Sequence, residues 1–505
     1  MIKLRKFNTP YPNPRDFENW RACPGAPVDS AFGEAGRDVA EDIRRFGGRT
    51  GARTHVDRAW TVCLHKARII DRETARTMLA AMRRMIESGG GLGGGEAALI
   101  KDLGDEDIGG LVNLGRTQQE PMSRFNMRDQ MLDFLEHYLG VLTSIADAVE
   151  RHAEVVMPGH THFSHSQPVT LGAYMLSVLD GLLRGLEQFE LAYGFVNRNS
   201  GGCGATSGIS WPVDRWLMTT LLGFDDLVEP TYDCEAAQDH SMAVLFAASN
   251  IALSASKPAM DFEIWGIDDL GWVANDPGYL GQSSFMPQKA HPGSRWEQVR
   301  VRLNVVLGQT VNGMFSTKGE SHSDVHPMVA MPGFVFDAVA VLKAAMRMFA
   351  LIVEHMHPRT DRLLACCRDG FSCASEVVVH LIKELGYGPR RGHRILATFV
   401  RLARQRGLTA PETTGDLLDE AAREAGEEPP GVDTKTLRHL LDPELFIRTH
   451  CHTGGPAPEE TARMLAVRRE RIARARERLN ERVERRREGL DMLEREVAAI
   501  LDGAS

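Results

Sequence analysis

The chain has little of what marks several classes of protein. It has eight cysteines in 505 residues and no CxxC pair, which speaks against a disulfide framework and indicates a reducing compartment. The apolar runs, such as Met348–Val353, are far shorter than the ~18 residues that a membrane-spanning helix needs. The formal net charge is −9, so we expect neither a membrane nor a nucleic acid as a general partner.

Targeting and phosphate-binding signals are missing as well. The first residues, MIKLRKFNTPYPNP, contain no apolar stretch of the kind found in secretory signals, so we expect a cytoplasmic protein. The glycine-rich segment SGGGLGGG, residues 88–95, follows no strand and does not fit GxxxxGK[ST]. It is therefore interpreted as a tether between elements.

Helical periodicity is what the chain has in place of these features. Residues 123–156 contain no proline and carry apolar side chains at three- and four-residue spacing, and no run alternates with period two. We predict an all-α subunit of three segments with five long helices in its centre. The segments are an N-terminal helical domain (1–122), a central long-helix bundle domain (123–365) and a C-terminal helical domain (366–505). The long helices are expected at 123–156, 171–197, 235–265, 292–316 and 334–356.

The two ends of the chain differ in composition and in residue pattern. The first 60 residues are rich in proline and glycine and predict an irregular arm, followed by a helix over Val56–Glu87. Near the C-terminus, Leu465, Ile472 and Leu479 fall on a seven-residue register and predict a packing stripe, for which another subunit is one candidate partner. The Arg468–Arg487 stretch mixes arginine with glutamate, which is typical of a solvated face.

One stretch, Gly281–Pro292 with the sequence GQSSFMPQKAHP, is the most informative about chemistry. It combines two serines with Lys289 just ahead of a predicted helix start. Such a loop can bind a carboxylate or phosphate, because backbone N–H groups and the helix dipole favour an anion there. From these residues alone, an ordinary polar loop is the alternative.

This stretch resembles the GSSxMPxKxNP loop of the fumarase/aspartase superfamily, which includes argininosuccinate lyase, adenylosuccinate lyase and carboxymuconate cycloisomerase. Met157–His162 with Gln167-Pro168 resembles the MPGYTHxQxAQP segment of argininosuccinate lyase, and Gly115–Gln119 stands where that lyase has GRSRN. The matches follow the family's order from about residue 100 to 465. By these motifs, the chain resembles argininosuccinate lyase most.

The resemblance implies an all-α fold and an anti elimination that releases fumarate from a succinyl group. Ser283 would be the base, Lys289 would hold the carboxylate that gains charge, and His162 would orient or protonate near the leaving group. The substrate would be a small dicarboxylate, with no organic cofactor and no metal. The other expected substrate contacts are Arg116, Thr117, Gln118, Gln119, Thr161, Gln167, Gln238, Ser284, Met286, His291 and Asp324. The family further implies a homotetramer with a 20-helix bundle, whose active sites combine segments from three subunits.

Several positions depart from the family pattern. His291 replaces the asparagine of KxNP. The glutamate that usually follows five residues later is displaced, since position 296 is tryptophan and Glu297 comes one residue on. A relay between His162 and Glu297 is therefore in doubt. Gln118, Gln119 and Gln238 stand where argininosuccinate lyase has Arg, Asn and Arg.

The positions that recognise the arginine end in argininosuccinate lyase are also changed, to Asp324, Val329 and Pro332. Each charge-assisted hydrogen bond lost would cost about 1.5–3 kcal/mol, so we do not expect argininosuccinate to be the substrate. Glu320, His322, Asp324 and His326 suit a cationic or amine-bearing leaving group. The hypothesis is an N-substituted aspartate with a different amine; a solvated polar loop is the alternative.

Three other functions are open at this stage. A carboxymuconate-type cycloisomerase shares the superfamily motifs. A metal-dependent hydrolase is suggested by His160, His162 and His165 and by His322 with His326, which are ligand-like residue types. A structural protein that has lost catalysis is the third, since the changes at Gln118 and His291 permit it, whereas the presence of Ser283, Lys289, Thr161 and His162 argues against it.

Overall fold

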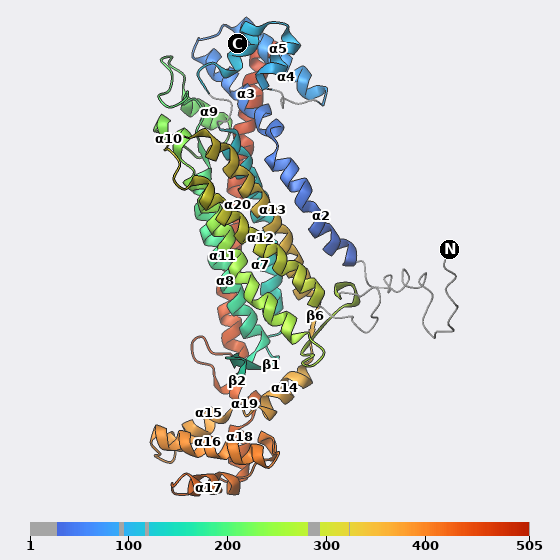
Figure 1. The fold of residues 1–505 in the computed structure, drawn as a ribbon, viewed down its shortest axis with the longest axis vertical. Coiled ribbons are helices and arrows are strands. Elements are labelled where there is room, and N and C mark those ends of the chain that lie inside the picture. Colours follow the sequence, from blue (N-terminus) through green and yellow to red (C-terminus); the bar gives the residue numbers. More distant parts are fainter. Residues whose placement is uncertain (1–27, 90–94, 117–120, 281–292, 323, 504–505) are drawn as a thin grey trace, which may run out of the picture.

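The computed structural model describes residues 28–89, 95–116, 121–280, 293–322 and 324–503. These residues form an elongated, largely helical molecule in which long helices run side by side along the main axis (Figure 1). The predicted all-α fold is confirmed. Among the described residues, no helix combines the length and the apolarity that crossing a membrane requires.

The centre of the molecule is the bundle that the sequence predicts, and all five long helices are present. They are α7 (Met122–Arg151), α8 (Leu171–Val196), α11 (Asp239–Trp265), α12 (Gly293–Thr317) and α13 (Val325–Glu354). The prediction for α13 was wrong at its start, because the helix begins nine residues before Phe334. Pro327 lies in its first turn, where a missing N–H is tolerated, whereas Pro332 lies inside the helix.

The bundle is held by one continuous apolar core. α8 is buried on most of its faces, in keeping with its apolar sequence. Near the start of α12, Trp296 is fully buried, and its ring lies 5.3 Å from that of Phe262 and 5.2 Å from that of Phe349. Large aromatic side chains contribute strongly to such cores, because each removes much apolar surface from water.

The N-terminal part corrects two predictions. Residues 28–60 are helical instead of irregular, and the helix predicted over Val56–Glu87 is two helices. The elements here are α2 (Val28–Gly47), α3 (Arg49–Lys66), α4 (Arg72–Glu87), α5 (Gly95–Leu103), α6 (Glu106–Gly110) and a 3₁₀ turn (Leu111–Asn113). The break comes at Arg68, whose φ of 59° is left-handed, and Asp71 then caps α4 by accepting a hydrogen bond from the Thr74 N–H at 2.8 Å.

Short helices and strands lie at both ends of the bundle. One end has α9 (Arg215–Leu221), α10 (Thr231–Ala236) and the strand pair of β3 (Arg198–Asn199) and β4 (Asp226–Leu227). The other end has a hairpin of β1 (Val156–Thr161) and β2 (Ser164–Thr170), the pair of β5 (Val273–Asn275) and β6 (Met356–Pro358), and a 3₁₀ turn (Pro277–Tyr279). The sequence analysis missed the hairpin, because its strands contain proline and do not alternate apolar with polar residues.

The C-terminal part forms a small helical unit and one very long helix. Its elements are α14 (Thr360–Asp369), α15 (Ala374–Lys383), α16 (Pro389–Gln405), a 3₁₀ turn (Ala410–Glu412), α17 (Gly415–Glu424), α18 (Thr434–Leu440), α19 (Pro443–Thr449) and α20 (Pro458–Asp502). The 45 residues of α20 return along the whole bundle to the N-terminal helices (Figure 1).

The apolar stripe of α20 packs within its own chain. Leu465, Ile472 and Leu479 join the bundle core, and Leu493 and Ile500 join the core of the N-terminal helices. A second subunit is therefore not needed to cover this stripe, which corrects the alternative considered from the sequence. The boundaries proposed for the three domains stay a prediction.

Candidate active site

The predicted site residues that the structure describes fall into two groups at opposite ends of the bundle. Arg116 precedes α7, whereas Thr161 and His162 follow it at the end of β1. The 30 residues of α7 rise about 45 Å, so these two groups cannot meet within one chain. Gln238 and Asp324 occupy the N-caps of α11 and α13, at the same end as Arg116.

His162 lies at the tip of the β1–β2 hairpin. Thr161 pairs with Ser164, so His162 and Phe163 alone form the turn, with φ values of 54° and 55°. Two consecutive left-handed residues define the type I′ geometry that two-residue hairpins favour, but non-glycine residues pay on the order of 1–2 kcal/mol each for it. Strain of this kind gathers at functional sites. Thr161, His162 and Phe163 are all exposed, Phe163 to 87%.

The hairpin is fixed by its neighbours. A Cβ on Gly159 would lie 2.6 Å from the Gln167 carbonyl oxygen across the hairpin, so a larger residue would force the strands apart there. The rings of His160 and His165 pack edge to face at 5.0 Å, and burial lowers the pKa of both. The side-chain amide of Gln167 donates a hydrogen bond to Ser375 Oγ at 3.2 Å.

Arg116 is engaged inside the protein. Its guanidinium is buried, forms an ion pair with Asp57 of α3, and donates from Nε to the Val112 carbonyl at 3.1 Å. Its backbone also pairs with that of Gly204. Within one chain the Arg116 side chain therefore holds the end of this segment in place, and its predicted contact with substrate stays a prediction.

Gln238 and Asp324 lie at the starts of α11 and α13, at the end of the bundle where Arg116 lies. Gln238 is half-buried, and its carbonyl accepts the hydrogen bond of the Met242 N–H. The Asp324 carboxylate is exposed and accepts a hydrogen bond from the Ser321 N–H at 3.0 Å. The His322 ring stacks on Tyr232 of α10, with 5.7 Å between ring centroids. Their substrate contacts stay predictions.

Eight predicted site residues lie outside the described residues: Thr117, Gln118, Gln119, Ser283, Ser284, Met286, Lys289 and His291. The structure does explain one departure from the family pattern, the glutamate at position 297 instead of 296. Position 296 points into the core, where Trp296 is fully buried, whereas Glu297 of α12 is exposed. A carboxylate at position 296 would be buried against aromatic rings, and the shift to 297 keeps it in solvent.

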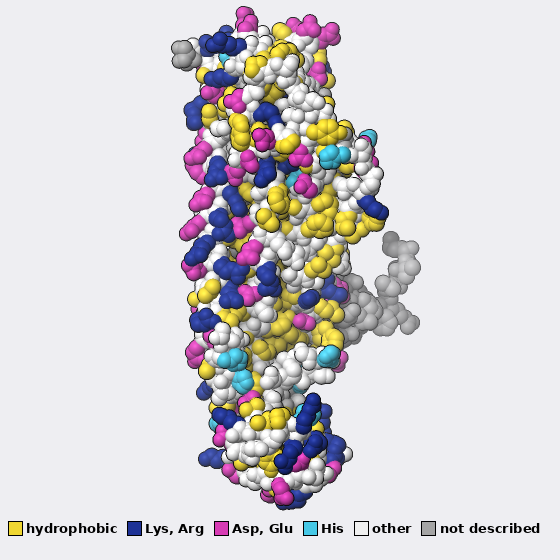
Figure 2. All heavy atoms as spheres, turned by 90° about the vertical axis from the view of Figure 1, so that its left-hand side faces the viewer, with side chains coloured by type: hydrophobic (Ala, Val, Ile, Leu, Met, Phe, Trp, Pro, Cys, Tyr) yellow, Lys and Arg dark blue, Asp and Glu magenta, His cyan; other side chains and the backbone are white. Residues whose placement is uncertain are grey.

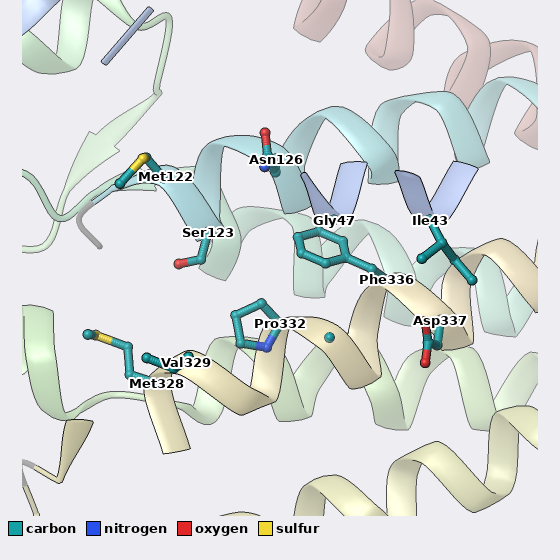
Figure 3. Close-up of a pocket in the computed structure, with 11 residues that line it drawn as sticks. Ile43, Gly47, Met122, Ser123, Asn126, Met328, Val329, Pro332, Phe336 and Asp337 are labelled. Carbon is teal, nitrogen blue, oxygen red and sulfur yellow. The ribbon is translucent and has the colours of Figure 1, made fainter. Parts of the chain in front are cut away.

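A cavity of about 310 Å³ lies beside the Arg116 group, between α2, α7 and α13 (Figure 3). Val329 and Pro332, two of the altered leaving-group positions, line it, as do Met122 and Ser123, which follow the predicted Thr117–Gln119 contacts in the chain. The sequence analysis missed the remaining lining residues, since no motif marks them: Ile43, Gly47, Asn126, Met328, Gly333, Phe336 and Asp337. Among the described residues that line this cavity, none is basic.

The ligand-like histidines form two separate groups. His160 and His165 lie at the hairpin, and His322 and His326 lie at the other end of the bundle. In the part of the chain that the structure describes, no group of three or more His, Cys, Asp or Glu side chains has an arrangement that could hold a metal ion. The geometry gives the hydrolase alternative no support.

Known proteins resemble this arrangement in sequence and in fold. A family model described as Lyase matches residues 66–308. The argininosuccinate lyase of Methanothrix thermoacetophila is 28% identical over 457 residues, which cover 86% of this chain and 92% of that protein. Argininosuccinate lyase 1 of Shouchella clausii is 27% identical over 375 residues, covering 73% and 75%.

Solved structures agree on the fold. The crystal structure of EDDS lyase in complex with formate matches with a TM-score of 0.88 and 24% identity, covering 95% of this chain and 97% of that one. The 3-carboxy-cis,cis-muconate lactonizing enzyme from Pseudomonas putida matches with a TM-score of 0.68 and 18% identity, covering 88% and 100%. At these identities the likeness concerns the fold.

Fold, motifs and relatives together point to one class: the chain is similar to the fumarase/aspartase superfamily in its sequence motifs and in its fold, and is an enzyme of the lyase type. Within that class it is an argininosuccinate lyase-like protein. The resemblance read from the sequence motifs is confirmed.

Proposed function

We propose that the protein is a carbon–nitrogen lyase that releases fumarate from an N-substituted aspartate by anti elimination, or adds an amine to fumarate in the reverse direction. The observation that carries this proposal is the presentation of Thr161 and His162 at the tip of an exposed, strained hairpin. A side chain held there at a local energetic cost is positioned for a task outside its own chain.

The roles follow from the chemistry of the step. The proton to be removed lies on a carbon next to a carboxylate and is weakly acidic, so the reaction needs a base and a cation for the charge that develops. Ser283 and Lys289, which lie outside the described residues, would supply them. His162 would act on the leaving nitrogen, since imidazole exchanges protons near neutral pH. Thr161 would bind a substrate carboxylate.

The active site would be completed by other copies of the chain. The two groups of site residues are about 45 Å apart along α7, so His162 of one copy must meet the Arg116 end of another. Large apolar side chains lie exposed on the outer faces of three bundle helices, and Figure 2 shows hydrophobic side chains gathered along this side of the molecule. They include Leu191 and Phe195 of α8, Phe246 and Leu253 of α11, and Val301, Val305 and Phe315 of α12. We infer a homotetramer with sites shared by three subunits.

Argininosuccinate is not the substrate that we propose, although several relatives bear that enzyme's name. Val329 and Pro332 line the cavity where the motif alignment places glutamine and lysine in argininosuccinate lyase, and neither can form a charge-assisted hydrogen bond. The second candidate function is a carboxymuconate-type cycloisomerase, which the shared fold with the P. putida enzyme favours.

The proposal is tested by incubating the purified protein with fumarate and a panel of amines and detecting N-substituted aspartates by mass spectrometry. Adduct formation that disappears in the Ser283→Ala variant is the expected result. A carboxymuconate substrate converted in place of any amine would favour the cycloisomerase, and fumarate release from argininosuccinate at an ordinary enzymatic rate would contradict the proposed specificity.

A further inference from the structure

Of the described residues that line the cavity between α2, α7 and α13, one is acidic. Asp337 lies on the face of α13 that also carries Met328, Pro332 and Phe336, and all four line the cavity. Figure 3 shows Met122 and Met328 at one end and Asp337 beside Ile43 at the other. From Met328 to Asp337 the helix rises about 13 Å, so the carboxylate is set well away from the end next to the predicted substrate contacts.

The charge of Asp337 is not balanced by the protein around it. Its carboxylate is half-buried and accepts a hydrogen bond from the Gln309 side-chain amide at 3.1 Å. No lysine, arginine or histidine among the described residues forms an ion pair with it, and burial raises its pKa. Asp133 of α7 differs, because it is paired with Lys343 at 2.7 Å.

The rest of the lining is apolar or neutral. Ile43, Met328, Val329, Pro332 and Phe336 supply hydrocarbon, and Ser123 and Asn126 supply neutral polar groups. A ligand that fits this lining has a hydrocarbon segment and a positive charge at its far end, because an apolar wall favours the first and an unbalanced carboxylate the second. A distal carboxylate would find no cation here and would face Asp337.

We propose that Asp337 determines specificity for the leaving group: the enzyme releases or adds an aliphatic amine that carries a second, cationic amino group at its far end, and Asp337 binds that group. This inference rests on the proposed lyase function and names its substrate class. Free α-amino acids are excluded as leaving groups by the same cavity, since it offers their carboxylate no partner. Glu320, Asp324 and the nearby histidines, which the sequence suggested for this task, are exposed.

The experiment compares linear α,ω-diamines of increasing length with monoamines of the same length as substrates for addition to fumarate. The wild-type homo-oligomer, Asp337→Asn, Asp337→Glu and the control Asp361→Asn, which removes an exposed carboxylate of α14, are assayed at a pH near 9 so that part of each amine is neutral. Ornithine serves as the amino-acid probe. Thermal unfolding verifies that each variant is folded.

We expect the wild type to prefer a diamine over its matched monoamine by about tenfold or more in kcat/KM, and Asp337→Asn to abolish this preference through KM. Asp337→Glu should keep the preference, and Asp361→Asn should behave as the wild type. Equal use of monoamines and diamines by the wild type, a preference that survives in Asp337→Asn, or efficient use of ornithine would overturn the inference.

The same variants separate this inference from the proposed function. If no amine is converted, calorimetric titration with the diamines in the presence of fumarate shows whether the cation site exists without the lyase activity. Diamine binding that is lost in Asp337→Asn would support the cation site and contradict the lyase activity. Diamine binding that is equal in both proteins, or absent from the wild type, would contradict the cation site.

Discussion

At the scale of the residue, the proposed site depends on one residue with a strained backbone and on one with an unbalanced charge. His162 adopts a left-handed backbone conformation at an exposed turn, although glycine or asparagine would form that turn at lower cost. Asp337 keeps a carboxylate in a cavity without a cation. Neither feature stabilises the subunit, so each is more readily explained by a ligand or a neighbouring copy.

Replacing His162 by alanine tests the role of the hairpin tip. We expect kcat to fall by roughly 10²–10⁴-fold, the range for losing a general acid or base, with little change in the unfolding temperature because the side chain is exposed. The readout is fumarate formation from the adduct identified with the amine panel. His439→Asn, at another exposed histidine, is the control and should retain activity. Undiminished turnover in His162→Ala would remove His162 from the catalytic groups.

At the scale of the element, two histidines, one in α3 and one at the end of α7, have surroundings that favour the neutral ring. Burial, followed by the charge of Arg58, lowers the pKa of His55 in α3 to about 4, and its ring stacks on Phe125 of α7 at 5.4 Å. Burial, followed by the charge of Arg151, lowers the pKa of His152 at the end of α7 to about 4.

The free energy of unfolding should therefore decrease as the pH falls from about 6.5 to 4. In this window the unfolded chain binds protons at both histidines and the folded chain does not, which gives a slope of up to about 1.4 kcal/mol per pH unit for each. Urea titrations at several pH values measure it. His55→Gln should reduce the slope, whereas His439→Asn should not; an unchanged slope in His55→Gln would show that His55 is protonated in the folded state.

At the scale of the whole molecule, the length of the bundle separates the two groups of site residues. A bundle built on helices such as α7 and α13 places the hairpin at one end and the cavity at the other. The exposed apolar faces of α8, α11 and α12 offer the surface through which copies would bring these ends together.

A mixing experiment tests this assembly. His162→Ala and Ser283→Ala should each be nearly inactive alone, and co-assembled chains should regain part of the wild-type activity, because some sites then receive both native residues from different copies. Gel filtration should give about four times the 55.9 kDa of one chain. A mixture as inactive as its components, or a protein that elutes as one chain, would contradict the shared site.

The sequence by itself determined the fold class, the five long helices and the resemblance to the superfamily. Apolar spacing of three and four residues specifies helices locally, and the motifs at 157–168 and 281–292 carry the family's chemistry in their residue types. It failed where local signals conflict with packing: glycines suggested that residues 28–60 are irregular, and proline suggested that α13 starts late, but burial against the bundle stabilises both helices.

Only the tertiary structure decided what each candidate side chain can reach. The sequence did not show that the guanidinium of Arg116 is buried against Asp57, and it gave no signal for Asp337, which lines the same cavity as Val329 and Pro332. Contacts between segments far apart in the chain, and the distance along α7, depend on how helices pack. Local sequence patterns do not encode such distances, because they record the periodicity of one element at a time.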